Sequence, residues 1–217
     1  MQIHNLTETN SVLNHFLGEI RNVNVHNDSM RFRRNIERIG EIMSYELSKE
    51  LHYAAVEIQT PLGVKKTTEI SHQLVVCSIL RAGLPLHMGF LNYFDQAENG
   101  FISAYRQHPN NDDYFEIIVE YQAIADFNEK YLLLVDPMLA TGQSIIAVFN
   151  KLMEKGNPKE IHIAVVIAAP EGIAHLESKL PENCHLWVAS IDEKLDEHSY
   201  IVPGLGDAGD LAYGTKI

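Results

Sequence analysis

The sequence predicts an α/β protein built on a doubly wound, mostly parallel sheet that is flanked by helices on both faces. Continuous apolar runs recur along the chain and are typical of strands that are buried on both faces, as parallel strands are. Helical periodicity follows each of the first three runs, and strands that alternate with helices form parallel sheets. The runs are Leu74 to Leu80, Leu132 to Val135, Ile161 to Ala169 and Leu186 to Ile191.

The chain is long enough for one domain with a large core. It has 217 residues, of which 46% are apolar and 21% are charged, and both fractions are ordinary for a globular protein. No internal repeat or linker divides it, so we expect a single domain over 1–217. Within that domain we expect an N-terminal helical region at 1–52, a protruding β-hairpin arm at 53–70, a core sheet at 74–191 and a C-terminal ligand-binding segment at 192–217.

Composition argues against several classes of protein. The net charge of −12 disfavours extended nucleic-acid binding, which relies on basic surface. Cys77 and Cys184 are too few and too far apart for a disulfide framework or a metal site. No run approaches ~20 consecutive apolar residues, so we expect no membrane span. The first residues, M-Q-I-H-N-L-T-E, lack the basic and apolar regions of a signal peptide, and we expect a cytoplasmic protein.

Residues 1–52 favour helices. The first 29 residues are polar, with an amphipathic patch between Val12 and Ile20. From Met30 to Leu47, apolar residues recur at helical spacing, which predicts a long amphipathic helix.

Residues 53–70 predict a β-hairpin. Tyr53 to Thr60 and Val64 to Ile70 have strand character, and Thr60-Pro61-Leu62-Gly63 suits a type I turn. A hairpin ahead of the main sheet has unpaired edges, so it either pairs with another subunit or adds to the edge of the same sheet. The pattern alone leaves both open.

The first core strand ends in Arg81-Ala82-Gly83, and a helix is predicted at 84–94. Gly83 permits a tight backbone, and the fork of an arginine suits bidentate contact with phosphate oxygens. The segment predicts a phosphate-binding loop, in addition to the one predicted at residues 131–144.

Residues 101–121 predict two further strands joined by a polar loop. Phe101 to Tyr105 ends at Arg106, and Tyr114 to Tyr121 resumes strand character. The polar loop at 107–113 would lie beside an anion site, which is typical of an active-site lid.

The segment Y-L-L-L-V-D-P-M-L-A-T-G-Q-S, residues 131–144, predicts a phosphate-binding loop between a strand and a helix. The first N–H groups of a helix have no internal partners and lie at the positive end of its dipole, so they stabilise an anion. Gly142 lets the backbone close around a phosphate, and Thr141 and Ser144 add hydroxyl donors. The carboxylate of Asp136 would repel phosphate unless it binds sugar hydroxyls or phosphate-bound Mg²⁺. The combination predicts a phosphorylated sugar as ligand.

Ligands of doubly wound sheets bind at the carboxyl ends of the strands. Arg81, Arg106 and Asp136 each follow the end of a predicted strand. We therefore expect these three residues to share one site.

Gly204 to Gly209, G-L-G-D-A-G, matches the dinucleotide-binding pattern G-x-G-x-x-G. That motif needs a strand before it, a helix after it and an acidic residue about 20 residues later. Residues 210–217 leave no room for the helix and the βαβ unit, so we reject that interpretation. Tyr200 to Gly209 instead predicts an irregular loop whose exposed amides and carbonyls read the edge of a flat ligand.

Four stretches together resemble the uracil phosphoribosyltransferase family of the type I phosphoribosyltransferases. They are I-L-R-A-G-L, the Tyr105-Arg106 pair, V-D-P-M-L-A-T-G-x-S and Y-I-V-P-G-L-G-D-A-G-D, and the resemblance as a whole runs from about Met30 to Lys216. The resemblance implies the type I phosphoribosyltransferase fold, with a C-terminal hood at 192–217 that binds the base. It also implies conversion of uracil and phosphoribosyl diphosphate (PRPP) to UMP and diphosphate, with Mg²⁺ bound mainly through PRPP.

The resemblance implies roles for particular residues. Catalytic roles fall to Arg106, Asp136 and Asp207, and Asp207 either assists deprotonation of uracil N1 or holds a metal-bound water. The implied uracil-binding residues are Ile201, Gly206, Asp207 and Ala208. The implied PRPP-binding residues are Arg81, Arg106, Asp136, Pro137, Met138, Leu139, Ala140, Thr141, Gly142, Gln143, Ser144 and Asp207.

The chain departs from the family near Ile117, where relatives commonly have a lysine in a Y-F-x-K-L run that here reads Y-F-E-I-I. The missing cation motivates a second interpretation, a catalytically weakened nucleotide-binding relative. A third is a pyrimidine-responsive RNA-binding regulator of the same fold, against which the net charge argues. The family also implies a homodimer or higher homo-oligomer that pairs through the 53–70 hairpin. GTP is an effector of some relatives. The sequence decides neither the number of subunits nor whether GTP activates this protein.

Overall fold

The structure, a computed structural model, describes residues 1–107 and 116–216 and confirms the predicted α/β architecture. An eight-stranded sheet forms the centre, in the order β1-β10-β9-β7-β4-β5-β6, with β8 paired to β9. Every pair in it is parallel except β5 with β6, which is antiparallel. The strands are β1 (Gln2–Asn5), β4 (Leu74–Leu80), β5 (Glu98–Gln107), β6 (Glu116–Ile124), β7 (Tyr131–Val135), β8 (Met138–Leu139), β9 (Glu160–Ala168) and β10 (Cys184–Ile191).

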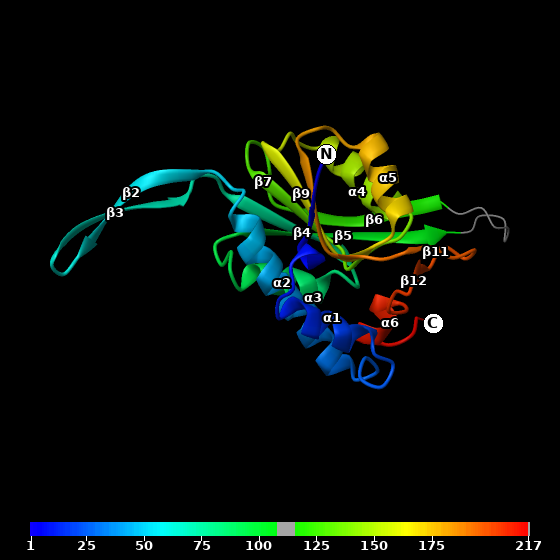
Figure 1. Cartoon of the computed structure of the whole chain (residues 1–217). Helices are drawn as coiled ribbons and strands as arrows, with labels where there is room; N and C mark the ends of the chain where they lie inside the picture. The colour runs from blue at the N-terminus through cyan, green and yellow to red at the C-terminus, as the bar shows by residue number, and fades with distance from the viewer. Residues whose placement is uncertain (108–115, 217) are drawn as a thin grey trace.

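Helices cover both faces of the sheet (Figure 1). One face packs against α4 (Gln143–Met153) and α5 (Pro170–Lys179), and the other against α1 (Leu13–Arg21), α2 (Ser29–Ser48), α3 (Leu84–Leu91) and α6 (Ala208–Tyr213). The central strands are buried on both faces, as the continuous apolar runs predicted. Each fully buried Leu or Ile side chain contributes about 1.5–3 kcal/mol, so these two layers hold the sheet together.

The strand order reverses between β4 and β7, and this reversal positions the functional residues. From β4 the chain moves outward to β5, and it then returns to β7, on the other side of β4, before continuing to β9 and β10. In doubly wound sheets the crevice outside the strand ends at such a switch point is where ligands bind. Arg81 follows β4, and Asp136 follows β7, so both stand at this crevice.

The N-terminal region differs from the prediction of helices alone. Residues Gln2–Asn5 form β1, which pairs in parallel with β10 at the edge of the main sheet. The sequence gives little sign of it because Q-I-H-N contains a single apolar residue and is too short to show alternation. The amphipathic patch predicted after it is α1, and the predicted long helix is α2.

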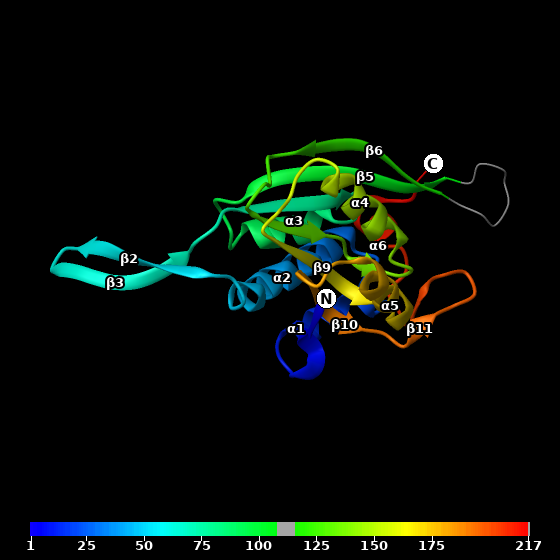
Figure 2. The ribbon, with the colours of Figure 1, turned by 90° about the horizontal axis from the view of Figure 1, so that it is seen from above.

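The hairpin of β2 (Tyr53–Thr60) and β3 (Gly63–Ile70) forms a separate two-stranded sheet and projects from the body of the domain (Figures 1 and 2). It is antiparallel and pairs in register from Tyr53–Ile70 to Thr60–Gly63. The interpretation as an edge hairpin of the main sheet is therefore wrong, since no hydrogen bond of the described residues joins β2 or β3 to that sheet.

Among the described residues, no helix has both the length and the apolar character needed to span a membrane. The longest helix, α2, has 20 residues and carries charged side chains along its exposed face.

Candidate active site

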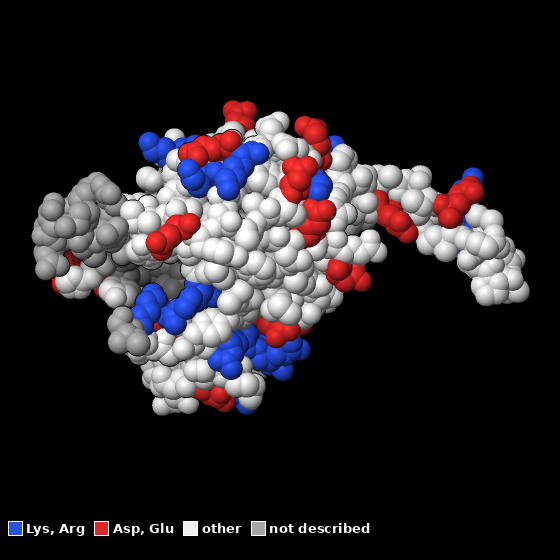
Figure 3. Space-filling model, turned by 180° about the vertical axis from the view of Figure 1, so that it is seen from behind, with Lys and Arg blue, Asp and Glu red and all other residues white. Residues whose placement is uncertain are grey.

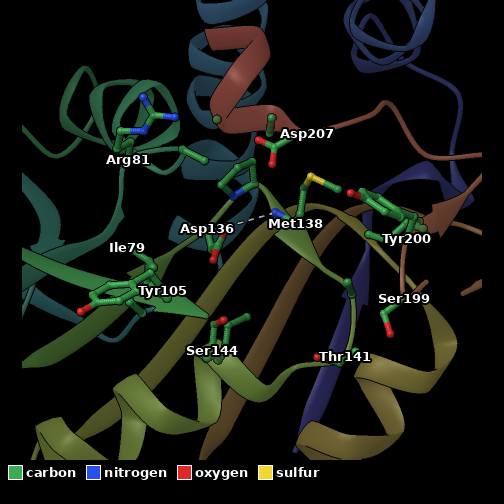
Figure 4. Close-up of a pocket in the computed structure, with 18 of the residues that line it drawn as sticks. Ile79, Arg81, Tyr105, Asp136, Met138, Thr141, Ser144, Ser199, Tyr200 and Asp207 are labelled. Carbon is green, nitrogen blue, oxygen red and sulfur yellow. Dashed lines mark hydrogen bonds between the residues drawn. The ribbon is translucent and has the colours of Figure 1, made fainter. Parts of the chain in front are cut away.

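A cavity of about 900 Å³ opens at the carboxyl ends of β4 and β7. It is lined by residues from the β4–α3 loop, the end of β5, the β7–α4 loop and the C-terminal segment. Figure 4 shows side chains from these segments arranged around one common space. The lining residues that lie in the segments predicted from the sequence are Arg81, Tyr105, Asp136, Pro137, Met138, Ala140, Thr141, Gly142, Ser144, Tyr200, Ile201, Gly206, Asp207, Ala208 and Gly209.

The β7–α4 loop has the form of an anion-binding turn. Gly142 is the N-cap residue of α4 with φ 79°, a left-handed conformation that favours glycine. Because Gly142 has no side chain, the N-cap residue supplies no acceptor to the first amides of α4, although the Gln143 amide donates to Thr141 Oγ1 at 3.5 Å. Thr141 and Ser144 lie beside these amides and line the cavity (Figure 4). The loop can therefore surround a phosphate with N–H and O–H donors.

Replacing Gly142 with alanine should disrupt this loop. A Cβ at this position would lie 2.5 Å from Leu176 Cδ1, and the left-handed conformation costs a non-glycine residue about 1–2 kcal/mol. We expect Gly142→Ala to lower the free energy of unfolding by about 1–3 kcal/mol and to weaken binding of phosphorylated ligands at least tenfold. Urea denaturation and calorimetry with UMP measure the two effects.

Gly18→Ala is the matched control for that variant. Gly18 lies inside α1 with nothing within 4 Å of the site of a Cβ, so alanine there should stabilise the helix slightly and leave UMP binding unchanged. Equal stability and equal UMP affinity for Gly142→Ala and wild type would contradict the anion-loop interpretation.

Asp136 is a partly buried carboxylate at the end of β7. Its Oδ1 accepts a hydrogen bond from the Met138 amide at 3.2 Å, which leaves Oδ2 facing the cavity (Figure 4). Burial raises the pKa of Asp136 to about 7, and the bond from Met138 opposes this rise only in part. A group that favours the ionised form, such as a bound sugar hydroxyl or a cation, would lower this pKa again.

The β4–α3 loop brings Arg81 to the cavity and ties it to the C-terminal segment. The Nη2 atom of Arg81 lies 3.3 Å from Asp210 Oδ1 and 3.4 Å from the carbonyl oxygen of Gly214. Gly83 lets the loop pack against the end of β7, since a Cβ there would lie 2.8 Å from the carbonyl oxygen of Val135. The predicted arginine loop is thus in contact with the crevice, and its charge is partly neutralised by Asp210.

The C-terminal segment covers the cavity from the side of α6. Its short strand β12 (Ile201–Val202) pairs with β11 (Lys194–Leu195) in a separate antiparallel sheet. Asp207 is the N-cap residue of α6, and its Oδ1 accepts from the Asp210 amide at 2.9 Å. The expectation that no helix could follow Gly209 is wrong, because the short α6 begins at Ala208. The rejection of a dinucleotide-binding unit stands, because β12 is antiparallel and outside the main sheet.

Two predicted site residues do not line the cavity, and the side chain of a third is not among those that the structure describes. Leu139 is fully buried beside β9 and Gln143 is exposed on α4, and neither lines the cavity. The backbone of Arg106 lies in β5 opposite Ile117, one residue after the cavity-lining Tyr105, and its side chain falls outside the described part of the chain. Most of the predicted lid at 107–113 also falls outside the described residues.

Several cavity residues were missed by the sequence analysis. His198 and Ser199 reach the cavity from the turn between β11 and β12, and Lys216 reaches it from the end of the C-terminal segment. Ser199 has φ 65°, an unusual conformation for a residue other than glycine. The signal was weak, since D-E-H-S-Y has no motif and nothing in the sequence places it next to the phosphate loop.

A second polar cluster lies at the opposite end of the sheet. Oε1 of Glu160 lies 3.3 Å from Nε2 of the buried His162 and 3.2 Å from Nε2 of His185. The Trp187 indole N–H donates to Nδ1 of His162 at 3.1 Å, so Nδ1 is the acceptor and the ring proton lies on Nε2. That proton occupies the position a metal ion would need. The cluster is therefore better described as a carboxylate held by histidines than as a metal site.

Replacing Glu160 with glutamine should destabilise the fold at neutral pH. The side chain is 14% exposed, and the contact with His162 holds the pKa of Glu160 below its ordinary value against the opposing effect of burial. A depressed carboxyl pKa stabilises the fold above the unfolded value, and this contribution is lost as pH falls through the folded one. We expect a loss of about 1–3 kcal/mol at pH 7 that shrinks in acid, measured by urea denaturation across pH.

Glu197→Gln is the matched control for Glu160→Gln. Glu197 also faces a histidine, with Oε1 3.6 Å from His198 Nε2, but both side chains are exposed. We expect no measurable change in stability for this variant. A Glu160→Gln protein as stable as wild type at pH 7 would show that the cluster contributes nothing.

Comparison with known proteins agrees with this geometry. The family model for uracil phosphoribosyltransferase matches residues 7–215. A uracil phosphoribosyltransferase of Porphyromonas gingivalis (strain W83) is 49% identical over 217 residues, which cover 100% of both chains. One from Thermococcus gammatolerans is 37% identical over 206 residues, covering 93% of this chain and 88% of its own. The solved structure of the AQ2163 protein from Aquifex aeolicus superposes with a TM-score of 0.88 and 27% identity over 100% of both chains.

The family match covers the β4–α3 loop, the β7–α4 loop and the C-terminal segment, which are the segments that form the cavity. The relatives are matched over nearly their whole lengths, so the similarity extends to the complete fold. This chain belongs to the uracil phosphoribosyltransferase family and is a pentosyltransferase of that family.

Proposed function

We propose that the protein transfers a phosphoribosyl group from PRPP to uracil, giving UMP and diphosphate in pyrimidine salvage. The observation that carries this proposal is the meeting of three segments around one cavity: an anion-binding turn, an arginine loop and a C-terminal hood. The first suits a 5′-phosphate, the second a diphosphate and the third a flat base. Each alone is common, and together they match the three parts of the two substrates.

The β7–α4 loop would hold the 5′-phosphate and the ribose. The phosphate would lie on the amides of residues 140–144, where the N-terminus of α4 stabilises negative charge. Asp136 would accept hydrogen bonds from the ribose hydroxyls through the oxygen that faces the cavity. Its pKa of about 7 in the free protein means that ribose binding near neutral pH releases a proton.

Arg81 and Arg106 would bind the leaving diphosphate. Arg81 borders the cavity and forms an ion pair with Asp210. If its guanidinium moves from Asp210 to the diphosphate, it exchanges one anionic partner for another. Two arginines spread the charge that builds on the diphosphate as the bond to C1′ breaks. Lys216 adds a further cation at the cavity wall.

The cavity residues fit Mg²⁺ held mainly through the diphosphate. This ion takes one or two carboxylates together with phosphate oxygens and water. Asp136 and Asp207 line the cavity, and each uses one carboxylate oxygen for a backbone amide, which leaves the other oxygen for such a role. Bound there, Mg²⁺ would help neutralise the leaving diphosphate.

The hood would orient uracil for attack through N1. Ile201, Gly206 and Ala208 line the cavity, and backbone groups of this segment can pair with the polar edge of a pyrimidine. Uracil held beside C1′ converts the reaction into a step within one complex, so positioning and charge supply most of the rate. Asp207 is next to these residues, where it would either receive the N1 proton or hold a metal-bound water.

Incubation with uracil, PRPP and Mg²⁺ tests the proposal directly. We expect UMP and diphosphate to form, with cytosine, adenine and orotate as much poorer substrates. Tight PRPP or UMP binding without turnover would identify a catalytically weakened relative instead, for which the isoleucine at position 117 would be the first suspect. We also expect a homo-oligomer that pairs through the 53–70 hairpin, which the mass of the purified protein in solution tests. Cell fractionation tests the expected cytoplasmic location, and an assay with added GTP tests for an effect of this nucleotide.

Nucleic acid is not an expected partner. On the face drawn in Figure 3, the described Lys and Arg side chains form separate groups mixed with Asp and Glu rather than one continuous basic surface. The net charge of −12 points the same way. A gel shift with pyrimidine-rich RNA should therefore show no complex at physiological salt.

A further inference from the structure

Arg21, the last residue of α1, reaches across the domain to the base of the hood. Its Nη1 donates to Asp192 Oδ2 at 2.7 Å, and its Nη2 donates to Asp192 Oδ1 and to Ser190 Oγ. Asp192 follows β10, and its side chain is 3% exposed. A bidentate arginine–carboxylate pair has a fixed geometry, so α1 and the end of β10 are held in one relative position.

The same pair also bonds both backbone groups of one residue of the hood, Gly204. Nη1 of Arg21 also donates to the carbonyl oxygen of Gly204 at 3.0 Å, and the Gly204 amide donates to Asp192 Oδ2 at 2.9 Å. Gly204 has φ 61°, and a Cβ at this position would overlap the carbonyl of Ile201. Both polar backbone groups of Gly204 therefore depend on the Arg21–Asp192 pair.

Gly204, which Arg21 and Asp192 bond, lies between residues that line the cavity. Ile201 precedes Gly204 in the chain and Gly206 follows it, and both border the site expected to hold the base. Among the described residues, the side-chain hydrogen bonds of the pair run to Ser190 and Gly204 and not to residues 136–144. A change in the pair should therefore move the base side of the cavity and leave the phosphate side in place.

We propose that Arg21 and Asp192 are positioning residues that set the shape of the base-binding side of the cavity. This inference rests on the proposed function for the identity of the base. It assigns to α1, which contributes no residue to the cavity lining, a role in selecting uracil. Since the pair is mostly removed from water, loss of one partner leaves the other charge without compensation and loosens the Gly204 turn.

Arg21→Ala and Arg21→Lys test the inference by steady-state kinetics. We expect Arg21→Ala to raise the KM for uracil at least tenfold while the KM for PRPP stays within twofold of wild type. Lysine keeps the charge but lacks the planar fork, so Arg21→Lys should raise the uracil KM by about threefold to fivefold. Arg34→Ala is the matched control, because the ion pairs of Arg34, with Glu37 at 2.6 Å and Glu41 at 3.5 Å, both lie within α2.

Hydrogen exchange supplies a readout that does not depend on turnover. The Gly204 amide should exchange at least tenfold faster in Arg21→Ala than in wild type or Arg34→Ala, at equal global stability of the core strands. Unchanged exchange would overturn the hold of the pair on Gly204. Faster exchange with both KM values unchanged, or with both raised equally, would overturn its assignment to the base side.

The wild-type chain is assayed first, so that two different failures are told apart. Absence of UMP formation by wild type overturns the proposed function and, with it, the role of the pair in selecting uracil. If Arg21→Ala does not fold, Arg21→Lys carries both measurements, and an Arg21→Lys protein identical to wild type in uracil KM and Gly204 exchange overturns the proposal.

Discussion

Replacing Asp136 with asparagine should lower kcat/KM for PRPP by about 10²–10⁴-fold. The carboxylate faces the cavity, and the hydrogen bond that it accepts among the described residues, from Met138, uses Oδ1. Two hydrogen bonds from ribose hydroxyls to a charged acceptor are together worth about 3–6 kcal/mol. Asparagine keeps the shape and can still accept from Met138, but it lacks the charge. Asp126→Asn is the control, because Asp126 lies in an exposed turn away from the cavity and should give wild-type kinetics.

The pH dependence of the reaction should identify the same carboxylate. Burial raises the pKa of Asp136 to about 7 in the free protein, so kcat/KM for PRPP should fall as pH drops below neutrality. Asp136→Asn should remove this acidic limb together with most of the activity. An unchanged acidic limb in the variant would mean that another group controls PRPP binding.

The Asp136→Asn substitution should raise the stability of the ligand-free protein above neutral pH, although it lowers the activity. A carboxyl whose pKa rises from 3.8 to about 7 on folding binds more protons in the folded state, so its contribution to stability falls as pH rises through this range. Asparagine does not ionise, so the Asp136→Asn variant does not lose stability in this way as pH rises. The ligand-free variant should be more stable than wild type at pH 8 by about 1–3 kcal/mol, a difference limited by the hydration that the partly buried carboxylate keeps, and equal to it near pH 3.

Arg106→Ala should reduce kcat by about 30-fold to 1,000-fold, equivalent to about 2–4 kcal/mol of transition-state stabilisation. Arg106 lies in the strand β5, next to Tyr105 at the cavity wall, and its backbone pairs with Ile117. Position 117 in β6, opposite Arg106, is an uncharged isoleucine, so the charge of Arg106 should matter more. Single-turnover kinetics with saturating PRPP separate this effect from weaker binding.

Arg31→Ala is the control for Arg106→Ala. Arg31 is an exposed arginine paired with Glu19 at 3.4 Å, far in the chain from the cavity segments, and its loss should leave kcat unchanged. Near wild-type turnover by Arg106→Ala would remove Arg106 from the proposed mechanism. Arg106→Lys should lie between the two, since a lysine keeps the charge without the bidentate fork.

The elements that position the site could be predicted because their residues carry strong local signals. Continuous apolar runs mark β4, β7 and β9, which are buried on both faces. Asp136 and Gly142 could be selected because a carboxylate at a strand end and a glycine before a helix each have a physical meaning at that position. The phosphate loop was therefore the most predictable part of the site.

Features that depend on distant partners could not be predicted. Strand β1 exists because β10 offers it an edge, and its own four residues give no periodicity. Arg21 and Asp192 are 171 residues apart, and no local pattern links them. The short helix α6 was missed because glycine-rich sequence favours loops, whereas Asp207 caps it and Arg33 from α2 bonds the carbonyl oxygen of Ala212.

A crystal structure of the protein with bound UMP would show whether one cavity holds phosphate, ribose and base as proposed. We expect the 5′-phosphate to lie within hydrogen-bond distance of the amides of residues 140–144, a ribose hydroxyl to contact Asp136, and the base to lie against residues 201–208. UMP bound in another cavity, or bound here with its phosphate turned away from the start of α4, would overturn the assignment of this cavity as the active site.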